Sequence, residues 1–306
     1  MPQRMHASAV AALAAIALVW PYPAAALRTP LSGADAASHA RLTATSRAPL
    51  LGVTVTTGHD LGQDEAQFGH LPIVHVYYSG LPPANAWSGT AGKAGAAVIA
   101  SFAANPSAVL SGADNAALSH FFDTAPRNHR VYYSYIHEPE HAVNHEGLNV
   151  TLYREAWLHV AALAAKANNP ELIPTLILEE YDLRLGSRGP AANRNWKQYI
   201  TPVIKVLAWD TYPAGTGKPM PPSFLMAPAI AATQSLHLAY GFAEFGIPTA
   251  QGRATWLNEI GGYLMSSGAL FGTYFDSSIY RGYRLTDTAS VAAWRHWVQA
   301  SAQAAG

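Results

Sequence analysis

The sequence predicts an α/β protein, a single-domain (β/α)8 TIM barrel that spans residues 49–306. Two observations indicate this fold. Eight short apolar runs follow one another along the chain, and most of the intervals between them leave room for a helix and two loops, as a βα unit requires. Hydrophobic residues make up 50% of the chain and charged residues only 12%, which provides enough apolar surface for a large core.

The predicted strands are runs rich in β-branched and aromatic residues, and turn residues bound each of them. Nearly all of their residues are apolar, as expected for a parallel sheet that is covered on both faces. In chain order, the predicted strands are Leu50–Thr57, Ile73–Ser79, Ala96–Phe102, Arg130–Ile136, Leu172–Glu179, Val203–Trp209, Leu236–Ala243 and Ala269–Phe275.

Helices are predicted where apolar residues recur at helical spacing between the strands. In the last of them, Trp294 and Trp297 lie three residues apart on one face. The first two intervals are too short for full helices, so helical stubs or loops are expected there. The predicted helices are Ser107–Phe122, Thr151–Ala167, Thr249–Met265 and Thr288–Ala302.

The residues before the barrel are typical of an export signal. In residues 1–26, Arg4 gives a positive start, Ala9–Trp20 is apolar, and Ala24-Ala25-Ala26 offers an A-x-A cleavage site. Two prolines interrupt the apolar run before it reaches the roughly 20 residues of a membrane span. Residues 27–48, rich in Ala, Ser and Thr, are expected to form a flexible leader. We therefore expect a secreted, extracellular protein with no membrane attachment after cleavage.

Charge and cysteine content exclude several classes of function. The chain has 19 Lys and Arg against 19 Asp and Glu, and a neutral chain without a basic run is a poor binder of nucleic acid or anionic membranes. It has no cysteine, which excludes disulfides, thiol nucleophiles and cysteine-ligated zinc. Its 13 histidines are scattered, so no metal site and no cofactor are expected. We also expect a monomer.

The ends of the predicted strands carry the informative polar residues. In this fold, the active site lies at the C-terminal ends of the strands. Carboxyl groups occur at five consecutive predicted strand ends, and aromatic residues accompany most of them. Flat apolar rings beside hydrogen-bond acceptors are what a sugar-binding cleft needs. The residues that we select from these ends are His137, Glu138, Glu180, Trp209, Asp210, Tyr212, Glu244 and Tyr274.

Two short motifs carry a resemblance to a known family. The run Tyr135-Ile136-His137-Glu138 is similar to the strand-four motif of glycoside hydrolase family 26, the β-mannanase group of clan A. The run Ala243-Glu244-Phe245-Gly246 looks like its strand-seven motif. Asp210 and Tyr212 resemble the residues that end strand six, whereas many relatives have Trp where this chain has Tyr274.

The resemblance implies an activity and assigns roles. It implies a secreted, retaining, endo-β-mannanase-like hydrolase of a β-linked polysaccharide or oligosaccharide, with Glu138 as acid/base and Glu244 as nucleophile. A carboxyl separation of about 5–5.5 Å would mean retention of configuration, and a nearby second carboxylate would raise the pKa of the acid. Which glycan is cut, and whether from chain ends, stays open.

Substrate binding is expected from the other selected side chains, with packing as the alternative for several of them. His137 is expected to hydrogen-bond Glu244 or the sugar, or else simply to pack at a strand end. The tyrosines are expected to orient the nucleophile or to stack on sugar, and Glu140 is a rival for the acid. The remaining expected binding residues are Glu180, Trp209, Asp210, Tyr212 and Tyr274.

Two other functions remain open on the sequence. One is a carbohydrate-binding barrel that has lost turnover. The other is a zinc metallopeptidase, because the HEPEH segment from His137 to His141 matches H-E-x-x-H. That pattern requires a helix, whereas the residues before it are typical of a strand and Pro139 would disrupt a helix that had already begun.

Overall fold

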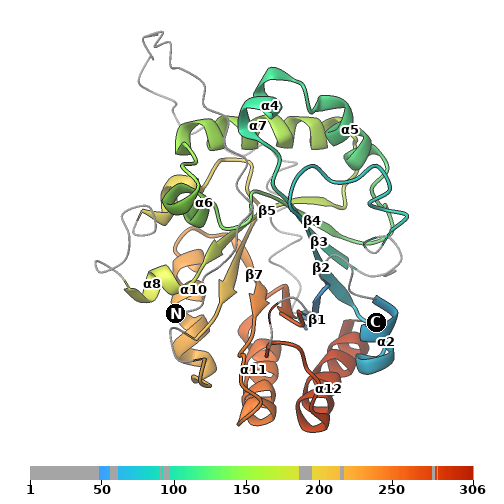
Figure 1. Ribbon diagram of the computed structural model, residues 1–306, viewed down its shortest axis with the longest axis vertical. Coiled ribbons are helices and arrows are strands. Elements are labelled where there is room, and N and C mark those ends of the chain that lie inside the picture. Colours follow the sequence, from blue (N-terminus) through green and yellow to red (C-terminus); the bar gives the residue numbers. More distant parts are fainter. Residues whose placement is uncertain are drawn as a thin grey trace.

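Figure 1 shows the computed structural model of the protein, which describes residues 48–55, 61–89, 91, 97–185, 195–213, 217–277, 280 and 282–305. The predicted signal peptide lies outside these residues, as does the predicted leader up to residue 47. Among the described helices, none has both the length and the apolar character of a membrane span.

Eight parallel strands form a closed barrel, which confirms the predicted fold. Each strand pairs with the next along the chain, and β8 pairs with β1. The strands are β1 (Leu50–Val55), β2 (Ile73–Tyr78), β3 (Ala97–Phe102), β4 (Val131–Tyr135), β5 (Leu172–Glu179), β6 (Val206–Thr211), β7 (Ala239–Phe245) and β8 (Phe271–Tyr274).

Strands β6 and β7 begin and end two or three residues later than the sequence predicts. The residues before β7 form a turn instead, in which His237 has left-handed backbone with a φ of 56°. Because both strands also end later, Asp210 and Glu244 lie inside strands rather than in loops. The sheet therefore fixes their backbones.

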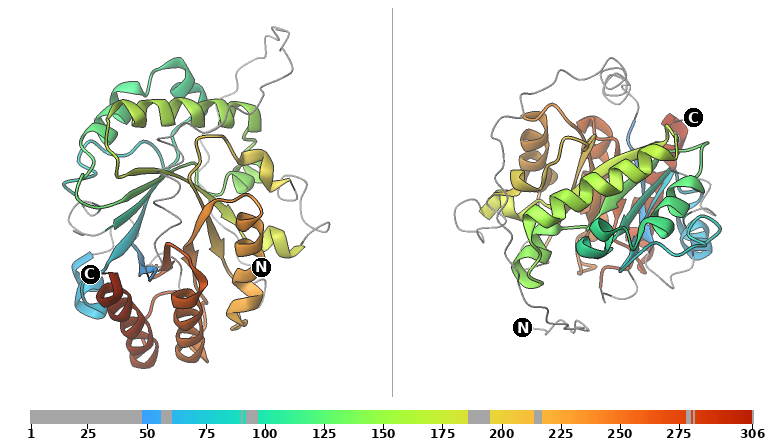
Figure 2. Two further views of the ribbon diagram at one scale, coloured as in Figure 1. Left: turned by 180° about the vertical axis from the view of Figure 1, so that it is seen from behind. Right: turned by 90° about the horizontal axis from the view of Figure 1, so that it is seen from above.

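The helices lie around the outside of the strands (Figures 1 and 2). The predicted helix Ser107–Phe122 is divided in two, because Gly112 ends the first part in left-handed conformation with a φ of 82°. Helix α10 is not predicted, because its sequence is apolar on most sides and lacks helical periodicity. The helices are α2 (Leu61–Phe68), α4 (Pro106–Ser111), α5 (Asn115–Asp123), α6 (Pro139–His145), α7 (Val150–Lys166), α8 (Tyr181–Leu185), the 3-10 turn η2 (Trp196–Tyr199), α10 (Pro222–Gln234), α11 (Arg253–Ser267) and α12 (Thr288–Ala305).

Successive strand side chains enter two separate apolar layers, because side chains alternate along a strand. The inner layer fills the barrel and includes Ile99, Ile177 and Phe271. The outer layer lies between the barrel and the helices and includes Trp209 and Trp294. The direction of a strand-end side chain therefore decides whether it reaches the barrel mouth or packs beneath a helix.

Candidate active site

A β-bulge turns Glu244 toward the inside of the barrel. Trp209 of β6 pairs with Phe242 of β7, whereas the next residue, Asp210, pairs with Glu244, so Ala243 is an extra residue in β7. An extra residue reverses the alternation of side chains beyond it. Without the bulge, Glu244 would point the same way as Phe242, into the outer layer. With it, Asp210 and Glu244 meet on the inner side at the barrel mouth.

A strained turn after β4 delivers His137 and Glu138 to the same mouth. Ile136 and Glu138 have left-handed backbone, with φ of 52° and 51°. In residues other than glycine this conformation is uncommon and costs about 1–3 kcal/mol, and such strain concentrates at functional sites. The amide of Glu138 donates a 3.2 Å hydrogen bond to the carbonyl of Ile177, and Pro139 then begins α6.

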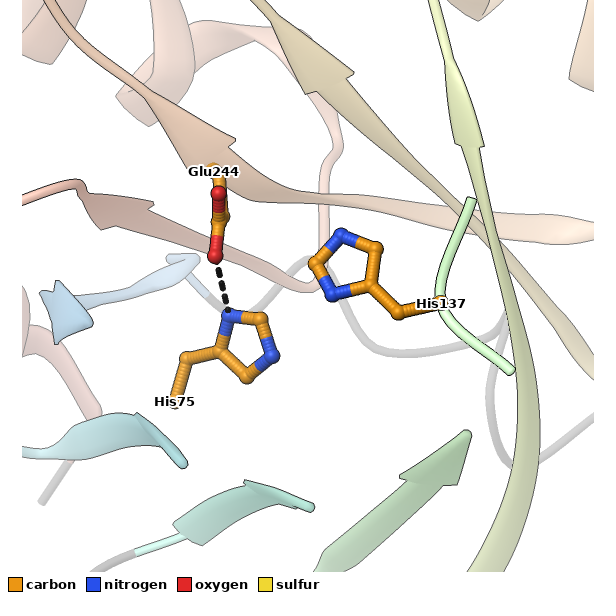
Figure 3. Close-up of side chains that lie close together, drawn as sticks. All are labelled: His75, His137 and Glu244. Atoms are coloured by element: carbon orange, nitrogen blue, oxygen red, sulfur yellow. Dashed lines mark ion pairs between the residues drawn. The ribbon is translucent and has the colours of Figure 1, made fainter. Parts of the chain in front are cut away.

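Two side chains hold the carboxylate of Glu244. The hydroxyl of Tyr212 donates a 2.8 Å hydrogen bond to Oε2. On the other side, Nδ1 of His75 lies 3.3 Å from Oε1 (Figure 3). Only 9% of Glu244 is exposed. Its carboxylate is therefore fixed in orientation, as an attacking group requires.

His137 lies close to both glutamates and to Asp210. Its Nε2 contacts the carboxylate of Asp210 closely. A ring nitrogen of His137 also lies within 4.8 Å of a carboxyl oxygen of Glu138, and likewise of Glu244. Figure 3 shows the His137 ring across a small gap from His75 and Glu244. The ends of β4, β6 and β7 thus bring three carboxyl groups around one imidazole.

The carboxyl groups of this cluster hold protons unusually tightly. Burial, and then the charge of Asp210, raise the pKa of Glu138 to about 8 and that of Glu244 to about 8. Burial also raises the pKa of Asp210 well above its usual range. Carboxyl groups that repel one another in a partly buried site cannot all ionise near neutral pH. The cluster can therefore supply a carboxyl group that stays protonated near neutral pH, as a general acid requires.

Glu180 is fully buried and paired with Arg184, so its predicted substrate contact is corrected. Its carboxylate forms this ion pair at 2.7 Å. The guanidinium of Arg184 also donates a 2.7 Å hydrogen bond to the backbone carbonyl of Tyr212. The pair thus braces the segment that carries the Tyr212 hydroxyl.

Trp209 and Tyr274 are packing residues, so the prediction that they bind substrate is wrong. Both are fully buried in the outer layer. The indole of Trp209 donates a 2.8 Å hydrogen bond to the hydroxyl of Thr233. The hydroxyl of Tyr274 donates a 2.7 Å hydrogen bond to the carbonyl of Tyr283, and its ring packs against Trp294. Strand alternation directs both rings under the helices.

Glu140 lies apart from the cluster, against β5. It is 1% exposed, and one carboxyl oxygen accepts a hydrogen bond from the amide of Glu179. Burial raises its pKa well above the usual range. The contact ties the first turn of α6 to the end of β5, so Glu140 anchors the turn that presents Glu138 and is a poor rival for the acid.

Three residues of the site are missing from the sequence prediction. His75 and Tyr77 lie on β2, and Ser101 lies on β3. The ring of Tyr77 lies edge-on to His137, with centroids 5.8 Å apart, and Ser101 Oγ lies 2.9 Å from His75 Nε2. The available signal was a histidine within an otherwise apolar strand, at a position that alternation turns inward.

The H-E-x-x-H interpretation fails on secondary structure. His137 precedes α6, which begins only at Pro139, so His137 and His141 do not lie one turn apart on a helix. The histidine pair on the helix is His141 and His145, whose ring centroids lie 4.5 Å apart. The metallopeptidase pattern is therefore not formed.

Comparison with known proteins supports the fold. No family model and no curated protein matches the sequence. Among solved structures, a GH26 β-mannanase from Bacteroides ovatus is 10% identical with a TM-score of 0.55, and the match covers 87% of this chain and 93% of that one. The GH26 endo-β-1,4-mannanase catalytic domain from Bacillus sp. JAMB-750 is 12% identical with a TM-score of 0.57, over 86% and 89%. An exo-β-1,4-mannosidase from an Opitutaceae bacterium is 12% identical with a TM-score of 0.60, over 85% and 60%. These similarities, at such low identity, establish that the chain is a (β/α)8 barrel.

Proposed function

We propose that this protein is a secreted, retaining glycoside hydrolase that cleaves a β-linked polysaccharide. The observation that carries the proposal is the convergence of Glu138 from β4 and Glu244 from β7 on one histidine at the barrel mouth. Glycoside hydrolysis needs two carboxyl groups, one protonated and one ionised, on either side of the scissile bond.

The roles of the two glutamates follow from their surroundings. Glu244, held by Tyr212 and His75, attacks the anomeric carbon and forms a glycosyl-enzyme. Glu138, beside Asp210, protonates the leaving oxygen in that step. It then takes a proton from the water that attacks the anomeric carbon and releases Glu244. His137 lies close to both carboxyl groups, with a ring nitrogen within 4.8 Å of an oxygen of each.

Mannan is the first substrate to test. The solved structures with the same fold include proteins described as β-mannanases and an exo-β-1,4-mannosidase. The motifs around Glu138 and Glu244 also resemble those of family 26. Hydrolysis of xylan, β-glucan and bacterial cell-wall polymers needs the same two acids, so these polymers are tested beside mannan in one panel of glycans.

The test is release of reducing sugar from that panel. We expect the purified protein to hydrolyse at least one β-linked glycan and Glu244→Gln to abolish the release. Product anomers followed by NMR should retain the configuration of the substrate. Glycan binding without release of sugar would instead favour a binding barrel without turnover, and inverted products would contradict a glycosyl-enzyme.

Secretion is proposed from the sequence of residues 1–26. We expect expression of the full chain in a bacterial host to yield a mature protein whose sequence begins at Leu27, after cleavage at the Ala24-Ala25-Ala26 site. Intact mass spectrometry of the exported fraction measures this. An uncleaved chain that remains inside the cells would contradict the proposal.

Tyr274 and Tyr212 should respond oppositely to loss of a hydroxyl. Tyr274→Phe removes a buried hydrogen bond to Tyr283, so the free energy of unfolding should fall by about 1 kcal/mol while KM stays unchanged. Tyr212→Phe removes the donor to Glu244, so kcat should fall with little change in stability. Urea unfolding and steady-state kinetics compare the two. A raised KM in Tyr274→Phe would show that this side chain contacts substrate after all.

A further inference from the structure

We propose that His75, His137 and Glu244 form a binding site for Zn²⁺ within the cleft, and that a bound zinc ion blocks hydrolysis by occupying Glu244. One ligand atom from each of the three residues lies within 4.8 Å of the other two. Two imidazole nitrogens and one carboxylate oxygen are a ligand set that zinc prefers, with a fourth position left for water. The site is distinct from the H-E-x-x-H pattern, which the structure does not form.

The distance between His75 and Glu244 already suits a shared metal. Ligands that sit about 2.0–2.1 Å from a tetrahedral zinc ion lie about 3.3–3.4 Å apart. Nδ1 of His75 lies 3.3 Å from Oε1 of Glu244. Figure 3 shows the His137 ring across the gap from this pair. The His137 side chain is only 9% exposed, and its ring nitrogen lies within 4.8 Å of both other ligand atoms, so a small shift of the ring would close the third side.

Each histidine is held through its other ring nitrogen, as metal-binding histidines usually are. Nε2 of His137 contacts the carboxylate of Asp210, and Nε2 of His75 lies 2.9 Å from the hydroxyl of Ser101. Nδ1 of each ring therefore remains for the metal. Binding requires the His75 tautomer that donates from Nε2 to Ser101, because the other tautomer donates from Nδ1 to the carbonyl of Ala243, 3.2 Å away.

Charge in the cleft favours a cation. Glu138, Asp210 and Glu244 bring three carboxyl groups together. Among the described residues, the basic side chains that contact Asp210 and Glu244 are histidines, with no lysine or arginine paired to these two carboxyl groups. A divalent cation would displace protons from these carboxyl groups and pair with their ionised form. The alternative set of His137, Glu138 and Asp210 has only one imidazole, whose Nε2 is already engaged by Asp210.

The site and its consequence are tested separately, because blocked hydrolysis rests on the proposed function and metal binding does not. Zinc chloride is titrated by calorimetry into the purified, chelator-treated protein. We expect one zinc ion per chain, and a loss of affinity greater than about 100-fold in Glu244→Gln and in His75→Gln, more than loss of a supporting residue costs. Absence of saturable binding, or full affinity in Glu244→Gln, would overturn the site.

Two controls distinguish this site from its neighbours. Glu138→Gln should keep zinc affinity, because Glu138 belongs only to the alternative set. The second control is a double variant, His141→Gln with His145→Gln, which removes the histidine pair on α6. This variant should also keep its zinc affinity. Loss of binding in that variant would assign the zinc to the surface. Because His75 is buried, Glu244→Gln decides the result if His75→Gln fails to fold, and tetrahedral Co²⁺ absorption bands give an independent signature.

The consequence is measured on whichever glycan the protein hydrolyses. Zinc should inhibit hydrolysis at the concentrations that saturate the calorimetric site, and a chelator should restore it. Saturation with zinc without inhibition would overturn the blocking role. If no glycan is hydrolysed, the proposed function fails, while the calorimetric result still decides the metal site.

Discussion

Glu244→Gln is expected to lower kcat/KM by about 10⁴–10⁶-fold on every substrate, because the substitution removes the carboxylate that forms the proposed glycosyl-enzyme. Tyr212 and His75 orient this carboxylate, and the amide that Glu244→Gln introduces would keep its shape while removing the nucleophile. Stability should change little, since the substitution is isosteric. Steady-state kinetics and urea unfolding of the same preparations measure both effects.

Glu138→Gln should behave differently, and the difference separates the two roles. Loss of the acid should lower the rate on polysaccharide by about 10²–10⁴-fold. On an aryl glycoside with an acidic phenol as leaving group, protonation is not needed to form the intermediate, so this first step should be nearly normal. A burst of phenol followed by slow turnover is the expected signature. Equal losses on both substrate types would contradict the assignment of Glu138.

Much of the barrel is predictable because its strands are continuous apolar runs. A buried parallel strand leaves that pattern directly in the sequence. The direction of side chains at strand ends is harder to predict. Trp209 is expected to end its strand and reach the cleft, but β6 continues to Thr211, and alternation turns the indole into the outer layer. Tyr274 is the last residue of β8, and alternation likewise turns its ring into the outer layer.

In the site, too, the types of residue can be predicted from the sequence, whereas the backbone geometry that directs them cannot. Glu138, Asp210, Tyr212 and Glu244 follow from acids and rings at strand ends. The bulge at Ala243 that turns Glu244 inward leaves no mark in the sequence, because it depends on how β7 pairs with β6. His75 is missed because it lies in the middle of β2, whereas the predicted site residues come from the ends of strands. Only the closed barrel brings His75 to Glu244.

Asp210→Asn is expected to move the pH profile of kcat/KM toward acid. After burial, the charge of Asp210 is the largest cause that raises the pKa of Glu138 and of Glu244, each to about 8. Removing that charge lowers both pKa values. The basic limb reports loss of the proton from the acid Glu138, and the acidic limb reports protonation of the nucleophile Glu244. Both limbs should therefore shift to lower pH.

The direction of the shift can be tested against a matched substitution. Asp276→Asn replaces a carboxyl that is also buried, after β8, but whose oxygen accepts a 2.6 Å hydrogen bond from the amide of Leu285. Burial raises its pKa to about 6, and the causes of its shift do not include Glu138 or Glu244. We expect Asp276→Asn to lower stability and leave both limbs of the pH profile in place.

Activity of Asp210→Asn should fall most steeply at alkaline pH, because Glu138 then loses its proton at a lower pH. A profile that stays fixed, or moves toward base, would mean that Asp210 does not control the proton on Glu138, and the acid would have to be sought elsewhere in the cluster.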